Sequence, residues 1–172
     1  MVTKINERDL ISMKLLHFFI TKKNYSPIIV QGVENEIWLE NLDNVDYKVI
    51  RIVNGYIHNN EQLDFDVFKT KRMVKKIKRK TFTFSINVLT ILTDIGENVD
   101  RERTFDGIDY VYAKDEVELL RNDLIKKTYK DLAKNMQYSE EGFQLFLKIT
   151  EEINQKNNKD SKENDQIFGP KK

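Results

Sequence analysis

Acidic side chains gather in the segment from Gln31 to Asp66, which holds eight of them against only two basic residues, Lys48 and Arg51. Carboxylate oxygens are the ligands that Mg²⁺ and Mn²⁺ prefer. We therefore predict a Mg²⁺ or Mn²⁺ site from the residues that fall in or beside loops near strand ends: Asp43, Asp46, His58 and Asp64. Their spacing matches neither a calcium loop nor a zinc motif. The alternative is an acidic surface that binds no metal.

A basic segment follows at once, because residues 69–80 contain eight Lys or Arg and no Asp or Glu. Such a patch suits anionic lipid headgroups or nucleic acid. No aromatic residue is interleaved with these lysines, which disfavours base stacking and makes nucleic acid the less expected partner. The residues assigned to an anionic surface are Lys71, Arg72, Lys75, Lys76, Lys78 and Arg79. The alternative is a solvated helix face that neutralises the acidic region.

The pattern Asp46-x-Lys48 opens an expected strand, in an element order of α-β-β-β-α-β. This is similar to the core of the PD-(D/E)xK nuclease superfamily, in which an acidic residue and the (D/E)xK motif bind Mg²⁺ and activate water. Glu36 or Glu40 would supply the first acid. The Pro-Asp half is missing, and so short a pattern is common by chance in a chain rich in Lys and Asp. A nuclease-like topology is therefore expected more than an active nuclease.

Hydrophobic patterning predicts the elements that position these residues. The first helix is apolar on too many sides for a surface helix, so we expect it to be buried, with a membrane-lying helix as the alternative. Asp115 and Glu118 have the capping-box spacing and open a later helix. The expected order is helix 5–23, strands 25–31, 36–41 and 46–53, helix 64–80, strand 83–93, a short edge strand 108–112, helix 115–135 and a last helix from Ser139 to about 153.

These elements make an α+β (mixed α/β) domain over residues 1–153, with about four strands in the α-β-β-β-α-β core and helices at the C-terminal end. Residues 154–172 are polar and predict a flexible linker. The 172 residues carry a net charge of +1 and no Cys, which excludes disulfides, zinc fingers and thiol catalysis. No apolar run reaches the 20 or so residues of a membrane span.

Several segments resemble the N-terminal soluble domain of bacterial rhomboid-family intramembrane serine proteases. The most specific is E-I-W-L-E at residues 36–40, and V-I-R-I at 49–52 follows it. L-D-F at 63–65, the basic helix and L-R-N-D-L at 120–124 also match. The ending I-F-G-P-K-K at 167–172 is similar to the basic segment before a first transmembrane helix, where positive charge favours the cytoplasmic side.

The resemblance implies a parent protease whose catalytic Ser and His lie in later transmembrane helices, so no catalytic residue is assigned to this chain. It implies a cytosolic regulatory domain at the cytoplasmic face of the membrane, which senses divalent cations or recruits partners and substrates. Its partners would be its own transmembrane protease domain and a protein or anionic lipid headgroups. We accordingly expect the reading frame to continue past Lys172.

Overall fold

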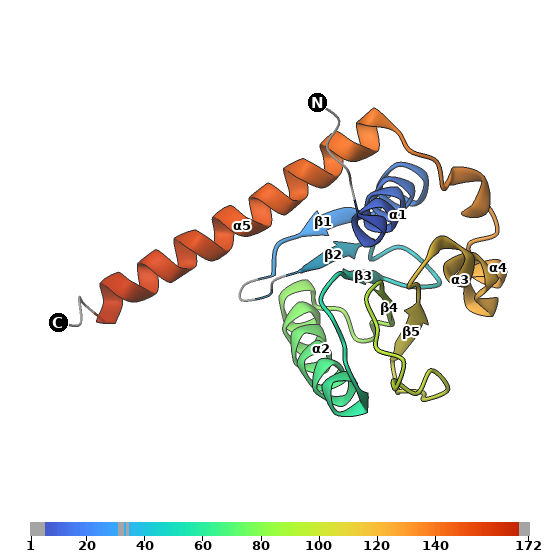
Figure 1. The fold of residues 1–172 in the computed structure, drawn as a ribbon. Coiled ribbons are helices and arrows are strands. Elements are labelled where there is room, and N and C mark those ends of the chain that lie inside the picture. The colour runs from blue at the N-terminus through green and yellow to red at the C-terminus, as the bar shows by residue number, and fades with distance from the viewer. Residues whose placement is uncertain (1–5, 31–32, 34, 169–172) are drawn as a thin grey trace.

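The computed structural model describes residues 6–30, 33 and 35–168, with side chains up to Asn157. Its centre is one five-stranded sheet with helices on both faces (Figure 1). The strands, in spatial order, are β1 (Ser26–Ile28), β2 (Glu36–Glu40), β3 (Val49–Val53), β4 (Val88–Leu92) and β5 (Ile108–Tyr112). The helices are α1 (Glu7–Lys23), α2 (Asn60–Thr81), α3 (Glu116–Arg121), α4 (Asp123–Thr128) and α5 (Glu140–Phe168). The predicted α+β class is confirmed.

The sheet is mixed. β1, β2 and β3 form an antiparallel meander, and α2 then crosses over to β4, which pairs with β3 in parallel. The first six elements thus follow the predicted order α-β-β-β-α-β. β5 adds a fifth strand, parallel to β4 at the edge of the sheet, with the bounds expected from the sequence. The agreement concerns element order, and a nuclease-like topology stays a prediction.

One face of the sheet carries the larger core, because residues of one parity on each strand point to the same side. Leu39, Ile50 and Ile91 pack there against α1. Phe18 and Phe19 of α1 meet Tyr129 edge-on, with ring centroids 6.2 and 5.1 Å away. The first helix is therefore buried, as predicted, and α5 packs beside it.

The opposite face is covered by α2. Trp38 alternates with Ile37 and Leu39 and lies on this side with Val67 and Val74 of the helix. Its alternation with Ile37 and Leu39 along β2 accounts for this orientation, because successive side chains of a strand point to opposite faces. The α2 side of the sheet also holds the buried charged side chains Glu36, Arg51 and Asp66.

The single helix expected over 115–135 is wrong. The chain forms α3, α4 and a 3-10 turn at Ala133–Asn135 instead. Asn122 ends α3 with extended backbone, and its side-chain oxygen accepts from the Ile125 N–H to start α4. A short polar side chain that caps a new helix competes with continuation of the old one. The predicted start is right, because Asp115 accepts from the Glu118 N–H.

α5 extends further than expected. The sequence predicts a helix end near 153 and a polar linker over 154–172. The backbone stays helical to Phe168, and residues 169–172 lie outside the described residues. Its first half lies against α1, and its second half runs out beyond the sheet (Figure 1). The Asn157 side chain reaches back and donates to the Val33 carbonyl at 3.0 Å. No helix within the described residues has the length and hydropathy needed to cross a membrane.

Backbone hydrogen bonds hold the loop after β3 against the loop after β4. Ile57 bridges to Ile95, and the Gly96 N–H donates to the Ile57 carbonyl at 2.8 Å. A Cβ at position 96 would lie 2.3 Å from the carbonyl oxygen of His58, so only Gly allows this approach. A Cβ at Gly55 would meet nothing closer than 3.7 Å.

We therefore predict that Gly96→Ala lowers the free energy of unfolding by roughly 1–3 kcal/mol, because the two loops must separate. Gly55→Ala is the matched control and should change it by no more than about 1 kcal/mol. Urea unfolding followed by circular dichroism measures both. Equal effects of the two substitutions would contradict the close approach at Gly96.

Candidate functional site

The four predicted metal ligands lie at two ends of the same strand. Asp43 and Asp46 precede β3 in an exposed turn, whereas His58 and Asp64 follow it. A five-residue strand is about 16 Å long, which separates the two pairs. His58 stacks on Tyr56 with ring centroids 3.9 Å apart, and Asp64 forms an ion pair with Arg103. The structure does not bring the four residues to one site.

Among the residues whose side chains are described, no group of three or more His, Asp or Glu is placed to hold a metal ion. The candidate nuclease residues also have separate surroundings. Glu36 is buried against Arg51, and Asp46 is exposed. Lys48 reaches the Ser85 carbonyl at 3.5 Å.

The buried charged side chains centre on Arg51, which lies at the middle of β3 and is 1% exposed. Its Nε donates to Glu36 of β2 at 2.5 Å, and its Nη1 donates to Asp66 of α2 at 2.8 Å. Its Nη2 donates to the other Asp66 oxygen, so the Arg51–Asp66 pair is bidentate. The Tyr110 hydroxyl of β5 donates to Asp66 at 2.6 Å. We call these four residues the Arg51 network.

Two effects oppose each other at Asp66. Burial raises the pKa of the Asp66 carboxyl, but hydrogen bonds from Arg51 and Tyr110 and the Arg51 charge outweigh it, so the pKa of Asp66 is lowered. Burial and the nearby Asp66 charge raise the pKa of Tyr110. Asp66 is therefore held as a carboxylate and Tyr110 as a phenol. Sequence reasoning missed this network, although an Arg inside the apolar run V-I-R-I-V is a signal for it.

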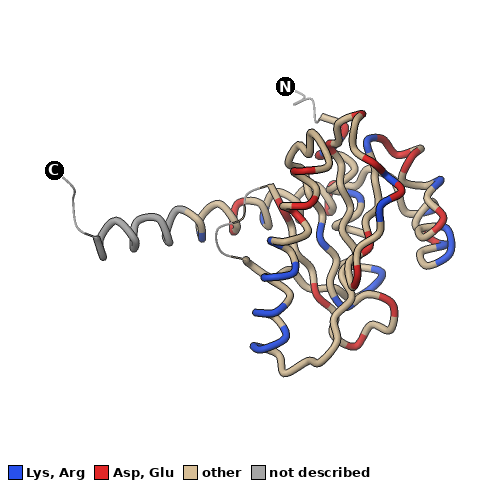
Figure 2. Tube along the Cα trace, turned by 90° about the horizontal axis from the view of Figure 1, so that it is seen from below, with Lys and Arg blue, Asp and Glu red and all other residues tan. Residues whose placement is uncertain are grey.

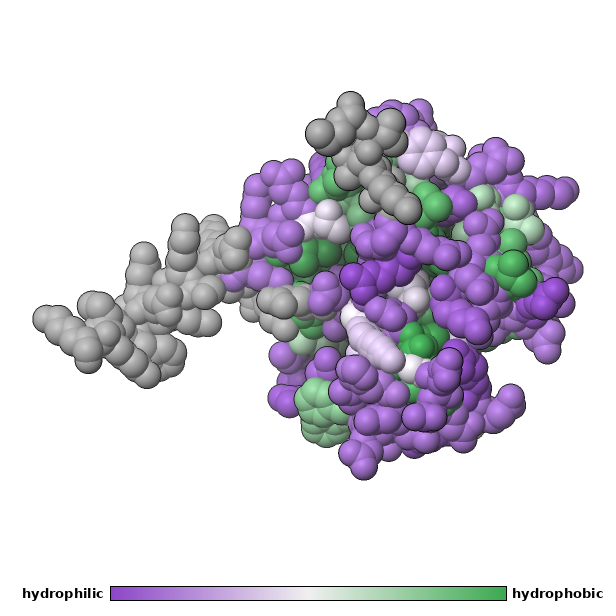
Figure 3. All heavy atoms as spheres, in the orientation of Figure 1, coloured by the Kyte–Doolittle hydropathy of each residue, from purple (hydrophilic) through white to green (hydrophobic). Residues whose placement is uncertain are grey.

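The predicted basic residues lie on α2 and are exposed, except Lys78, which is half-buried. Figure 2 shows Lys and Arg along the C-terminal half of this helix. The sequence reading found no aromatic residue among them, but the preceding turns of α2 expose Phe65 and Phe68. Lys69 lies 5.3 Å from the Phe65 ring centroid and Arg72 5.8 Å from that of Phe68. Figure 3 accordingly shows exposed hydrophobic surface over α2, among hydrophilic residues.

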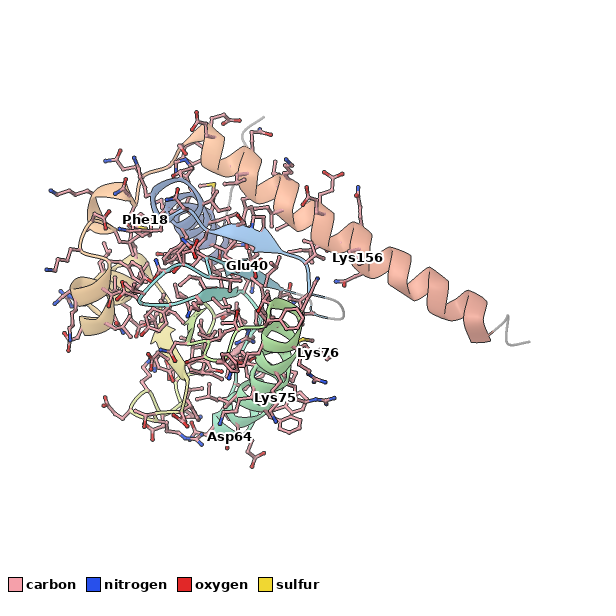
Figure 4. The ribbon with its side chains drawn as sticks, turned by 180° about the vertical axis from the view of Figure 1, so that it is seen from behind. Phe18, Glu40, Asp64, Lys75, Lys76 and Lys156 are labelled. Carbon is pink, nitrogen blue, oxygen red and sulfur yellow. The ribbon has the colours of Figure 1, made fainter. Side chains whose placement is uncertain are left out.

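Two adjoining cavities separate α2 from the β1 side of the sheet, and both are lined by Met73 and Lys76. The first has a volume of about 320 Å³ and is lined by Ile28, Ile29, Val30, Glu40, Met73, Lys76, Ile77, Lys80 and Thr81. The second has about 280 Å³ and reaches Glu36, Trp38 and Arg51. We call them together the α2 groove. Glu40 and Lys76 lie on the two sides of it (Figure 4).

Trp38, which lines the second cavity, carries a buried donor without an acceptor. The residue is 2% exposed, and its Nε1–H has no hydrogen-bond partner among the described residues. A buried N–H without an acceptor costs free energy. Trp38 lines the second cavity with Lys69, Arg72 and Lys76, so an anionic group bound there would meet positive charge.

Comparison with known proteins assigns no family. No protein-family model matches the chain, and no curated protein matches it.

Arg51→Met should lower the free energy of unfolding by roughly 3–5 kcal/mol, because it leaves the Glu36 and Asp66 carboxylates buried without their cation. Urea unfolding measures the loss. Arg72→Met on the exposed side of α2 is the control and should change stability by less than about 1 kcal/mol. A loss at Arg51 no larger than at Arg72 would contradict the buried network.

The lowered pKa of Asp66 predicts a dependence of stability on pH. An ordinary unfolded Asp has a pKa of about 3.9. A folded-state pKa below this value contributes stability that is fully present above about pH 4 and is lost as the pH falls through the folded pKa. The difference in unfolding free energy between the wild type and Asp66→Asn should therefore shrink below about pH 4. A difference that stays constant down to about pH 2 would contradict the assignment.

Proposed function

We propose that the chain is a non-catalytic extramembrane domain of a rhomboid-family intramembrane protease, and that it recruits a partner or substrate through the α2 groove. One observation carries the proposal. Two of the segments that resemble the rhomboid domain, the E-I-W-L-E strand and the basic helix, supply much of the lining of the groove. Glu36, Trp38 and Glu40 come from the strand, and Met73, Lys76 and Lys80 come from the helix.

The lining of the groove indicates what it recruits. Ile28, Val30, Met73 and Ile77 offer apolar contacts, and Lys76 and Lys80 add positive charge at the rim. A polypeptide segment with apolar side chains and acidic neighbours complements this surface. Recruitment is favoured over divalent-cation sensing because β3 separates the four candidate ligands.

The buried charges also support a binding role. Glu36, Arg51 and Asp66 are the charged side chains of the described interior, and they satisfy one another in the Arg51 network. Their role is to hold β2, β3 and α2 together beneath the groove. In the parent protein the domain would lie at the cytoplasmic face of the membrane, beside its own transmembrane protease domain.

The reading frame downstream of Lys172 tests the family assignment. We expect several apolar spans of about 20 residues, with a Ser in a Gly-rich context and a His in a later span. Sequencing the transcript past residue 172 decides the point. A stop codon directly after Lys172 would remove the rhomboid proposal.

Recruitment predicts a change in KM rather than in kcat. In the full-length protease, Lys76→Glu with Lys80→Glu should raise KM for a protein substrate roughly two- to tenfold, because two rim charges turn repulsive toward an acidic segment. The value of kcat should be unchanged. Lys126→Glu with Lys130→Glu changes the same charge at exposed positions outside the groove and is the control. An equal KM in both variants would contradict recruitment by the groove.

A further inference from the structure

The C-terminal end of α2 combines positive charge with fully exposed aromatic side chains. Phe82 and Phe84, in the turn after the helix, are 90% and 99% exposed. The last two turns before them carry Lys75, Lys76, Lys78, Arg79 and Lys80 with no acidic residue. We call this surface the α2 tip, and define it as residues 75–84.

Phe82 has a backbone conformation that suits other residues better. It ends α2 in the left-handed region, with φ 55° and ψ 36°, and its N–H donates to the Lys78 carbonyl. Asn24 ends α1 with nearly the same angles, φ 61° and ψ 31°. Asn and Gly are the residues that adopt this position easily, whereas a bulky side chain is strained there. Strain of this kind persists where function demands the residue.

The fold itself gains little from the phenylalanine. A side chain that is 90% exposed contributes almost no apolar burial, and Phe84 next to it contributes still less. The domain would therefore be as stable or more stable with Asn at position 82. Among the described residues, the two rings are therefore free to be buried by another surface.

The neighbouring charges indicate what that surface is. Five cations within two turns, beside two exposed rings, match the composition of segments that lie on anionic bilayers. The headgroups attract Lys and Arg, while Phe side chains enter the boundary of the acyl chains.

We propose that the α2 tip docks on an anionic lipid surface, with Phe82 and Phe84 inserted below the headgroups. Nucleic acid is the rival for the same cations, and the test separates the two. The proposal goes beyond recruitment by the groove and does not depend on it, since it can be tested with this chain alone. A failed vesicle experiment would leave the reading-frame test untouched, and a stop codon after Lys172 would leave the vesicle result untouched.

The experiment is co-sedimentation of the 172-residue chain with vesicles of phosphatidylcholine containing about 30 mol% phosphatidylglycerol, at about 50 mM salt. We expect binding that falls at about 500 mM salt and is lost on pure phosphatidylcholine. Phe82→Asn combined with Phe84→Ser should lower the partition coefficient roughly tenfold or more. Its melting temperature should be equal to or above that of the wild type, which excludes unfolding as the cause.

Val117→Ser, which removes an exposed apolar side chain from α3, is the control and should bind vesicles as the wild type does. Lys75→Glu with Arg79→Glu should abolish the salt-sensitive part of binding. Any of three results would overturn the proposal: no binding to the anionic vesicles, binding that survives the double phenylalanine variant, or tighter binding to an oligonucleotide than to vesicles at the same salt.

Discussion

The burial of Arg51 is the constraint on which this structure depends. A guanidinium at the middle of the central strand must be paired, because an unpaired charge in the interior costs several kcal/mol. Its partners come from two other elements, Glu36 on β2 and Asp66 on α2. Both oxygens of Asp66 are engaged, so the pairing fixes the rotation of α2 as well as its distance from the sheet.

Because the rotation of α2 is fixed, the residues that its other side exposes to solvent are fixed as well. Val67, Thr70 and Val74 share the buried side with Asp66, which turns Arg72, Lys75, Lys76 and Arg79 toward solvent. The near-neutral net charge is therefore the sum of two groups of charged residues with different roles. The buried charges stabilise the fold, and the exposed cations of α2 are available for binding. The α2 groove and the α2 tip overlap on this exposed surface at Lys76, Ile77, Lys80 and Thr81.

Local signals in the sequence predicted much of the fold. The β-branched and aromatic residues at 108–112 and the Asp115 cap are short-range features, and both lie where expected. Asn122 shows the limit of such local signals. Its capping hydrogen bond starts a new helix, whereas the hydrophobic pattern around it favours one continuous helix, and the sequence does not show which of the two prevails. The four residues predicted as metal ligands are near one another in sequence, but they lie at opposite ends of β3. The partners of Arg51 lie on other elements, and no local sequence pattern identifies them.

Docking of the α2 tip on a membrane can be tested directly by measuring how deeply a label at the tip enters the bilayer. The chain contains no Cys, so Phe84→Cys and Val117→Cys each allow a single nitroxide label. Collision of the label with oxygen and with a water-soluble nickel complex, measured by electron paramagnetic resonance on anionic vesicles, reports its depth. If the tip docks on the membrane, the label at position 84 should favour oxygen over nickel when vesicles are added, while the label at 117 should not change. Equal exposure of both labels to nickel on the vesicles would contradict it.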